Sequence, residues 1–205
     1  MRNMFSRASM RSNPQLNNHN NNGKYVMPIK FYSNPVNALN GKKVEEEQPK
    51  MNLPKMKWGE PTWFFLHCLA EKIKEEEFLN KKDDILKHIF SICTNLPCPY
   101  CSNHAKIYLN KINFNTITSK QDLKHMLYMF HNNVNSTKGY SLFNENLLDS
   151  QYQSMNFYQV INNFLYHYEN NNGGLKLVAD NMFRKNIAKE LKTWLMNNIY
   201  HFNKY

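Results

Sequence analysis

The sequence has few cysteines, no long apolar run and no acidic residue before Glu45. Only 4 of its 205 residues are cysteine, which is too few for a secreted domain of this size that is held together by disulfides. It contains no run of about 18 apolar residues, so no transmembrane helix is expected. Residues 1–25 have no apolar core of the kind found in secretory signals. We therefore expect a fold that rests on its apolar core, with cysteines that are used for chemistry.

The basic charge is concentrated at the start of the chain. The net charge is +10, and residues 1–57 hold ten Lys or Arg against three Glu. This composition, rich in Asn and Ser, predicts a disordered tail over residues 1–55. Arg2, Arg7 and Arg11, with serines between them, also fit a mitochondrial presequence, which is the alternative to a solvated basic tail. The rest of the chain is nearly balanced in charge, so we expect no nucleic-acid partner.

From Trp58 onward, apolar residues recur at a spacing of three or four, which predicts helices; no alternating strand or repeat is found. Four helices are predicted: from Pro61 to about Glu77, from about Asp83 to Asn95, from Cys98 to about Lys111, and from the capping pair Ser119 and Asp122 onward. Their buried stripes are Trp63, Leu66, Ala70 and Ile73 in the first, Ile85, Ile89 and Ile92 in the second, and Leu123, Leu127, Phe130 and Val134 in the fourth. The pattern predicts an all-α fold, with a four-helix bundle in residues 56–148.

Two more helical patterns follow an irregular stretch that ends near Ser150. One carries Phe157, Ile161, Phe164 and Tyr168 and is stopped by Gly173 and Gly174, and the other carries Phe183, Ile187, Leu191, Trp194 and Ile199. We interpret four further aromatic residues as core or interface positions and not as cofactor contacts: Tyr152, Tyr158, Tyr166 and Trp194. Residues 149–205 are thus predicted to be a helical extension of the bundle.

The sequence Cys98-Pro99-Tyr100-Cys101 opens the third predicted helix. A helix N-terminus stabilises a thiolate through its dipole and free N–H groups, so this CxxC predicts disulfide exchange. Trp63 and His67 are four residues apart, as are His131 and Asn135, so each pair shares one face of a helix. Flat rings, imidazoles and amides are the groups that a bundle core needs to hold an isoalloxazine and an adenine.

Three motifs in order resemble the Erv/ALR family of FAD-linked sulfhydryl oxidases. They are the run from Trp58 to His67 (WGEPTWFFLH), the LPCPYC sequence followed by His104, and His131-Asn132-Asn133-Val134-Asn135. The similarity covers about residues 57–145 and is greatest to the short enzymes of large DNA viruses. It implies a helical FAD-binding bundle that makes disulfides in thiol substrates, with O₂ as electron acceptor and hydrogen peroxide as product.

The resemblance also implies roles for individual residues. Cys98 would exchange with the substrate, and Cys101 would lie against the flavin as a charge-transfer thiolate and pass electrons to it. The FAD contacts would be Gly59, Trp63, His67, Tyr100, His131, Asn132, Val134, Asn135 and Lys138, and no metal is expected. Glu60 stands where cellular members often have Arg, and Tyr140 stands at a Lys position, so the phosphate contacts are expected to differ.

Partners and location follow from the same resemblance. No cysteine follows Cys101, so thiol proteins are expected to exchange directly with this pair, or through a small thioredoxin-like carrier. A homodimer through the first two helices is the default expectation. A viral enzyme would act in the host cytoplasm or virion, and the mitochondrial intermembrane space is the alternative.

Other interpretations of the CxxC remain open at this point. A glutaredoxin-like protein has the same C-P-Y-C sequence but needs a strand before it. Cys93, Cys98, Cys101 and His104 are zinc-ligand types, although their spacing lacks the usual gap between ligand pairs. A helical interaction module with an incidental dithiol is the third alternative. Cys68 and Cys93 are either buried free thiols or a pair, which would be a disulfide between the first two helices or an accessory redox pair.

Overall fold

The computed structural model describes residues 56–170 and 178–205, which belong to one compact unit. Its α-helices are α1 (Gly59–Lys72), α2 (Glu75–Cys93), α3 (Pro99–Leu109), α4 (Lys120–Thr137), α5 (Leu148–Gln153), α6 (Phe157–Glu169) and α7 (Val178–Asn198). Short 3-10 turns lie at Phe114–Thr116, Glu145–Leu147 and Ile199–His201. Within the described ranges there is no strand beyond one isolated bridge, so the all-α prediction is confirmed. The predicted tail, its presequence alternative and the glycine stop at 173–174 lie outside the described residues.

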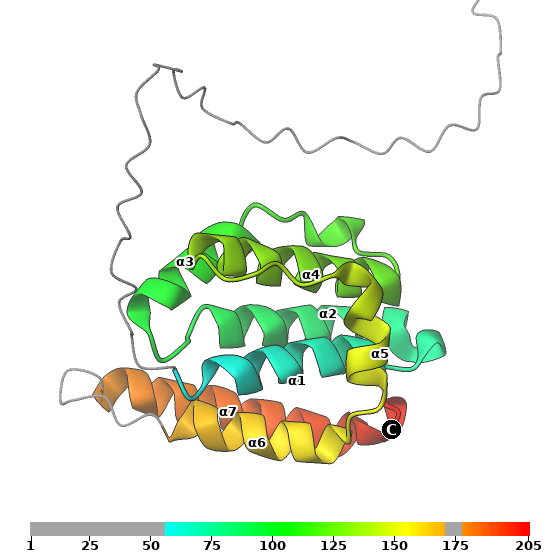
Figure 1. Cartoon of the computed structure of the whole chain (residues 1–205). Helices are drawn as coiled ribbons and strands as arrows, with labels where there is room; N and C mark the ends of the chain where they lie inside the picture. Colours follow the sequence, from blue (N-terminus) through cyan, green and yellow to red (C-terminus); the bar gives the residue numbers. More distant parts are fainter. Residues whose placement is uncertain (1–55, 171–177) are drawn as a thin grey trace, which may run out of the picture. The chain divides into compact units, whose positions relative to one another are not determined.

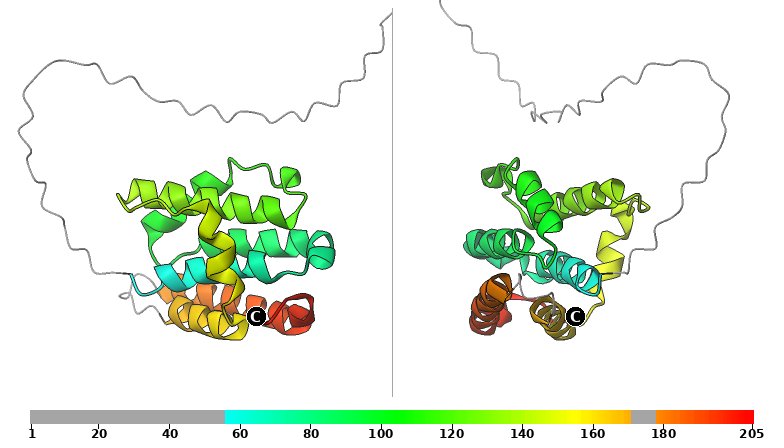
Figure 2. Two further views of the ribbon diagram at one scale, coloured as in Figure 1. Left: turned by 45° about the vertical axis from the view of Figure 1, so that its right-hand side comes forward. Right: turned by 90° about the vertical axis from the view of Figure 1, so that its left-hand side faces the viewer.

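The helices form three layers of two, which both Figure 1 and Figure 2 show. α3 and α4 form one outer layer, α1 and α2 the middle layer, and α6 and α7 the other outer layer. α5 runs across the edge of the molecule, beside α1, and connects the α4 layer to the α6 layer. Over the described residues, no helix has both the length and the apolar character that a membrane span requires. The predicted domain boundary at residue 148 falls at the start of α5 and stays a prediction.

α1 is the central helix and is buried on nearly every side. It contacts α4, α5 and α6, and its buried residues are Pro61, Thr62, Phe65, Leu66, His67, Cys68, Leu69, Ala70 and Lys72. A helix with neighbours on nearly every side buries residues around its whole circumference, whereas a surface helix buries only one apolar stripe. The predicted stripe was therefore too narrow, although three of its four members are buried and Trp63 is half-buried.

The predicted boundary between the first two helices was wrong. α1 ends at Lys72 and α2 begins at Glu75, although no glycine or proline interrupts this stretch. The break is made by the C-terminal residues: the Lys74 N–H donates to the His201 carbonyl at 3.0 Å, and the Asn203 N–H donates to the Lys72 carbonyl at 2.7 Å. Three glutamates in the first turn of α2 are a start signal that the periodicity alone did not reveal.

The start of α4 is as predicted. The Ser119 hydroxyl accepts from the Asp122 N–H at 3.1 Å, and the Asp122 carboxylate accepts from the Ser119 N–H at 2.9 Å. Both halves of a capping box are thus present. The predicted stripes of α2 and α4 are also buried, with Val134 half-buried at the end of α4.

α6 and α7 close the core against the middle layer. The predicted stripe of α6 is buried, and its Phe164 ring stacks on Phe65 of α1 with centroids 4.4 Å apart. In α7, Ile187 and Leu191 of the predicted stripe are buried and Trp194 is half-buried, as is Ile199 just after the helix. Arg184, Ala188 and Leu195 complete the buried face. Phe183, predicted in the stripe, is 58% exposed, so that assignment was wrong. Tyr158 and Tyr166 are exposed as well, so they are not core residues, and an interface role for them stays a prediction.

Buried charges hold the short α5 in place. Lys124 of α4 forms ion pairs with Glu71 of α1 and Asp149 of α5, and Lys72 donates from Nζ to the Gln153 carbonyl at 2.6 Å. These carboxylates raise the pKa of Lys124 above its ordinary value, although burial opposes them. α5 in turn carries Tyr152, which is 3% exposed and faces α1.

Candidate active site

The two cysteines of the CxxC occupy different positions at the start of α3. Cys98 is the N-cap residue, and its Sγ accepts a hydrogen bond from the Cys101 N–H at 3.2 Å. Pro99, at the first helical position, needs no hydrogen-bond partner for its nitrogen and suits a helix start. This N–H contact fixes the Cys98 sulfur at the start of α3, in position for thiol–disulfide exchange.

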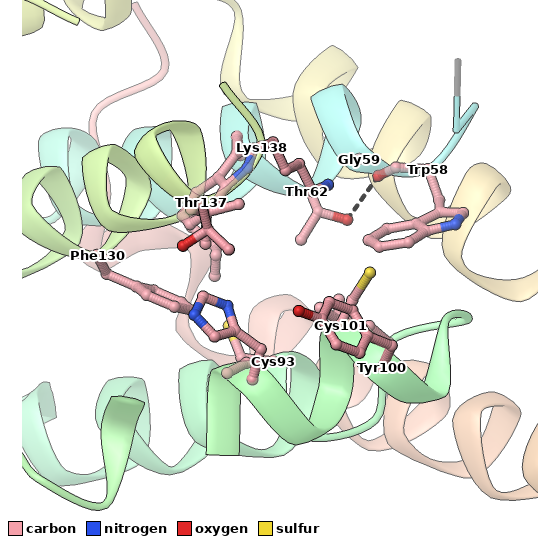
Figure 3. Close-up of a pocket in the computed structure, with 15 residues that line it drawn as sticks. Trp58, Gly59, Thr62, Cys93, Tyr100, Cys101, Phe130, Thr137 and Lys138 are labelled. Carbon is pink, nitrogen blue, oxygen red and sulfur yellow. Dashed lines mark hydrogen bonds between the residues drawn. The ribbon is translucent and has the colours of Figure 1, made fainter. Parts of the chain in front are cut away.

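A cavity opens on the side of α3 that carries Cys101, and we call it the inner cavity (Figure 3). It has a volume of about 120 Å³ and lies between α1, α3 and α4. Its lining residues are Trp58, Gly59, Thr62, Trp63, Leu66, Cys93, Leu96, Tyr100, Cys101, His104, Ala105, Phe130, Val134, Thr137 and Lys138. The Cys101 sulfur points across it toward Thr62 and Trp58 of the α1 side. Thr62 itself donates to the Trp58 carbonyl at 2.7 Å.

The electrostatics of the pair separate the two thiols. Burial, the hydrogen bond with Cys98 and the charge of Cys98 raise the pKa of Cys101 to about 12, and the Lys138 ammonium opposes this shift. In the reduced dithiol, Cys101 is therefore the thiol that keeps its proton at neutral pH. Cys98 lines neither the inner cavity nor the outer one described next, so only Cys101 can touch a group bound inside.

A second space, the outer cavity, adjoins the first. The two share Gly59, Trp63, Val134 and Lys138 as a common wall. The outer cavity is further lined by Met56, Glu60, Phe64, His131, Asn135, Tyr140, Phe143, Gln151 and Tyr152. Both departures from the family pattern, Glu60 and Tyr140, thus line the same cavity. Together the two spaces run from a thiol at one end to imidazole and amide groups at the other.

Aromatic rings are layered beneath the outer cavity. Trp63 stacks on His131 with centroids 4.0 Å apart and planes 11° apart, and Tyr152 stacks on His67 at 4.7 Å and 12°. The two layers are joined by a hydrogen bond of 3.1 Å between His67 Nε2 and His131 Nδ1. α1, α4 and α5 each contribute to this stack, so the positions of its rings depend on the packing of all three helices.

Both imidazoles in the stack are neutral at pH 7. Burial, and then the neighbouring His131, lower the pKa of His67 to about 3, and burial lowers that of His131 to about 4. In a pair of neutral imidazoles one nitrogen donates and the other accepts, so the hydrogen bond fixes both rings in place. His67 is only 4% exposed and lines neither cavity, which makes its contact with His131 its clearest role.

Asn132 orients the segment that follows α4. Its Nδ2 donates to the Phe143 carbonyl at 3.0 Å, and its Oδ1 accepts from the Phe143 N–H at 2.9 Å. Gly139, with a φ of +69°, allows the chain to turn back beside α4. Asn132 lines neither cavity, whereas Tyr140 and Phe143 of the returning segment both line the outer one. The direct cofactor contact expected of Asn132 stays a prediction.

The remaining cysteines are buried free thiols, in line with one of the two alternatives from the sequence. The Cys68 thiol lies 3.7 Å from Met155 Sδ, and burial raises its pKa to about 12. Cys93 lines the inner cavity, where burial raises its pKa to about 12 as well. In the described part of the chain, no three His, Cys, Asp or Glu side chains form a metal site. The CxxC lies between two helices, whereas a glutaredoxin needs a strand before it.

Several cavity residues were not predicted from the sequence. Those of the inner cavity include Trp58, Thr62, Leu96, Phe130 and Thr137. Trp58 and Leu96 stand inside the quoted motifs, so the motifs could have suggested them, whereas Thr137 carries no signal. Tyr152 is buried, as interpreted, but it also lines the outer cavity. Trp194 lies between α2 and α7, where its Nε1 donates to Asp84 at 3.1 Å, as an interface residue should.

Comparison with known proteins decides the family of the chain. The sequence model of the Erv1 / Alr family matches residues 60–154. The fowlpox virus protein FPV093 is 30% identical over 73 residues, which are 36% of this chain and 69% of that protein. The chain belongs to the Erv1/Alr family. This confirms the resemblance seen in the sequence, and the match runs from α1 to the end of α5 with the CxxC inside it.

Other members of the Erv1/Alr family are viral and mitochondrial. An FAD-linked sulfhydryl oxidase of African swine fever virus is 33% identical over 78 residues, which are 38% of this chain and 65% of that protein. The mitochondrial FAD-linked sulfhydryl oxidase erv1 of Schizosaccharomyces pombe is 28% identical over 87 residues, 42% of this chain and 48% of that protein. The chain thus spans just under two thirds of the swine fever virus relative. No solved structure matches it.

Proposed function

We propose that this protein is an FAD-linked thiol oxidase that forms disulfide bonds in protein substrates. The proposal rests on the different positions of the two cysteines of the CxxC. Cys101 opens into the inner cavity, whereas Cys98 caps α3 outside both cavities. Such a pair can accept electrons from a thiol on one side and deliver them to a bound acceptor on the other. The names of the relatives supply the acceptor, FAD.

The residues present fit FAD. The inner cavity has a volume of about 120 Å³ and the adjoining outer cavity about 500 Å³, so a ligand of the size of FAD has to occupy both. The walls of the inner cavity offer the faces and edges of Trp58, Trp63 and Phe130, which suit a flat ring system. The outer cavity adds imidazole, amide and tyrosine groups, and Lys138, on the shared wall, supplies a cation for a phosphate.

In this proposal Gly59, Trp63, Tyr100, Val134 and Lys138 contact the cofactor in the inner cavity. His131 and Asn135 contact it in the outer cavity, and His67 and Asn132 act through His131 and Phe143. FAD, when bound, supplies an acceptor for two electrons, and O₂ can reoxidise this acceptor to give H₂O₂. The thiol chemistry itself is performed by the chain.

The thiol chemistry starts from the Cys98–Cys101 disulfide. A substrate thiolate attacks the Cys98 sulfur, a mixed disulfide forms, and the Cys101 sulfur leaves. A second substrate thiolate attacks the substrate sulfur of the mixed disulfide, which releases the oxidised substrate and the Cys98 thiolate. The enzyme now holds two more electrons, and these leave through Cys101, the only member of the pair inside the cavity. The net reaction is 2 R-SH + O₂ → R-S-S-R + H₂O₂.

Proton transfer follows from the same arrangement. The Cys101 sulfur that leaves takes up a proton, because its pKa as a free thiol is raised to about 12. That proton has to be lost again when the disulfide re-forms. Cys98 then attacks the Cys101 sulfur as the electron pair departs, and Lys138 favours the anionic form of Cys101 on the way. The hydrogen bond from the Cys101 N–H holds the attacking Cys98 sulfur beside Cys101.

Partners and assembly are the finer part of the proposal. Substrates are thiol proteins, which exchange directly or through a thioredoxin-like carrier. The predicted homodimer would pair through the first two helices. Less of their surface is available for a partner than expected, because α6 contacts α1 and α7 contacts α2 within the chain. The relatives include viral and mitochondrial proteins, so both proposed locations, a virus-infected cell and a mitochondrion, agree with the family.

The direct test is oxygen consumption by the full-length chain, purified and supplied with FAD, with dithiothreitol as substrate. The proposal expects one O₂ consumed and one H₂O₂ formed for each dithiothreitol oxidised. The chain freed of FAD should lose this activity and regain it when FAD is returned. A chain that takes up no FAD, or consumes no oxygen with FAD bound, would overturn the proposal.

A further inference from the structure

A third hollow lies on the opposite side of α3 from the inner cavity, and we call it the α7 pocket. It has a volume of about 320 Å³. Three elements form it: the loop after α2 provides Asn95, α3 provides Pro99, Ser102 and Lys106, and α7 provides Phe183 and Arg184. The family match ends at residue 154, so one wall of this pocket comes from a helix outside the matched domain.

Helical periodicity divides α3 between the two hollows. Pro99, Ser102 and Lys106 follow the spacing of one helix face and line the α7 pocket. Cys101 and Ala105 lie on the other face and line the inner cavity. Cys98 precedes both sets at the N-cap. The α7 pocket therefore begins beside the thiol that meets the substrate, on the side away from the cofactor.

The charges of the α7 pocket have one sign. Arg184 is only 4% exposed. Its Nη2 donates to the Asn181 side chain, and its Nε has no partner among the described residues. A buried N–H donor without an acceptor is costly, so the pocket favours a ligand that accepts hydrogen bonds. Lys106 adds a second cation, and no carboxylate is found among the described residues that line the pocket.

The hydrogen-bonding groups around the two cations are largely occupied within the fold. The Ser102 hydroxyl donates to the Leu96 carbonyl at 2.9 Å, and the Asn95 amide donates to the Ser91 carbonyl at 2.8 Å. The pocket thus offers an incoming group mainly positive charge. Within it, Phe183 is 58% exposed, so apolar surface lies beside the two cations.

We propose that the α7 pocket binds an acidic side chain of the substrate protein, close in sequence to the cysteine that is oxidised at Cys98. This inference rests on the proposed function and names a feature of its substrates. The carboxylate is recognised by Arg184 and Lys106 through charge-assisted hydrogen bonds. Phe183 contacts the neighbouring apolar part of the same segment. Small thiols such as dithiothreitol carry no carboxylate and are oxidised without this contact.

The test compares two synthetic peptides with the full-length, FAD-loaded enzyme. Both contain the same Cys-x-x-Cys sequence, with glutamates on both sides in one and glutamines in the other. Charge-assisted contacts predict that kcat/KM for the glutamate peptide is about tenfold higher. Lys106→Glu, at an exposed position, should abolish the preference and leave dithiothreitol oxidation unchanged. Arg184→Gln should do the same, and the Lys106 variant keeps the test valid if this buried change prevents folding.

A matched control carries the same change of charge elsewhere. Lys189 is exposed on α7 and does not line the pocket, so Lys189→Glu should retain the preference. Equal rates for the two peptides, or a preference that survives Lys106→Glu, would overturn this inference while leaving the oxidase intact. An enzyme that oxidises neither peptide nor dithiothreitol would remove the proposed function and the inference with it.

Discussion

The two sides of α1 are packed in different ways. Toward α6 the helix is in a solid apolar core, where Phe65 and Phe164 stack at 4.4 Å and both are fully buried. Toward α4 it borders two cavities, and its Trp63 and His67 meet His131 in a stack that contains a buried imidazole pair. The first side fills its space with side chains, and the second leaves space and buries polar rings.

This difference shows where stability and chemistry reside in the molecule. A close-packed apolar face gains free energy from every contact. A face that leaves cavities and buries imidazoles gives up part of that gain, as proteins commonly do at functional sites. Substitutions toward α6 should therefore change the stability of the fold, and substitutions toward α4 should change the chemistry.

The largest expected effect is on the α4 side, at the thiol that enters the inner cavity. Cys101→Ser removes the only sulfur of the CxxC that can reach a bound acceptor. Oxygen consumption with dithiothreitol should fall at least about 100-fold, and the variant should still bind FAD. Cys68→Ala is the matched control, because it removes a buried thiol that lines neither cavity. Normal turnover by Cys101→Ser would disprove the assigned role.

On the α6 side the expected effect is on stability alone. Phe164→Ala deletes a fully buried ring and should lower the free energy of unfolding by about 3–5 kcal/mol. Tyr158→Ala, on the exposed face of the same helix, should change it by less than about 0.5 kcal/mol. Urea unfolding measures both, and kcat per folded, FAD-loaded enzyme should be unchanged. A loss of kcat in Phe164→Ala that exceeds its loss of folded protein would contradict the division of roles.

Acid should weaken the α4 side through the imidazole pair. His67 and His131 have pKa values of about 3 and about 4 in the fold, against an ordinary 6.5. The unfolded chain therefore binds more protons between about pH 4 and 6.5, so this contribution to stability is complete above 6.5 and falls as the pH drops. Near pH 5 each imidazole contributes a slope of about 1.4 kcal/mol per pH unit.

The contribution of the pair can be isolated from that of other groups by substitution. Unfolding free energies measured from pH 7 to pH 4 should decline less steeply in His67→Phe than in the native chain. Gln121→Ala, which changes an exposed side chain of α4 that does not titrate, should keep the native slope. An unchanged slope in His67→Phe would mean that the pair does not titrate on unfolding.

The smallest expected effect is at the wall that the two cavities share. Trp63→Phe keeps an aromatic ring but reduces its stacking area toward His131 and the bound cofactor. FAD affinity should fall by up to about tenfold, in line with the worth of one aromatic contact. Trp194→Phe, between α2 and α7, should leave FAD affinity unchanged. Equal loss in both variants, measured by fluorescence titration, would mean that the effect is one of general stability.

The same contrast explains which features were predictable from the sequence. Stripes that pack solidly, such as Ile85, Ile89 and Ile92, repeat at helical spacing and were predicted correctly. The capping pair Ser119 and Asp122 was also recognised, because both of its partners are local in sequence.

Features imposed by distant residues were missed. The break after Lys72 depends on backbone bonds from His201 and Asn203, which no local pattern reveals. Phe183 was assigned to the buried face of α7, but Arg184 occupies that face instead, because residue type alone does not fix the phase of a helix. Tyr152 acquires its place beside His67 only through the ion pairs that dock α5.

The most direct test of the central claim is the absorption spectrum of the full-length protein with FAD bound, titrated anaerobically with dithiothreitol. The account predicts a flavin band near about 450 nm that bleaches as the dithiol is reduced and returns when air is admitted. A protein that binds no FAD, or whose flavin band is unchanged by dithiothreitol, would contradict the coupling of Cys98 and Cys101 to a cofactor in the inner cavity.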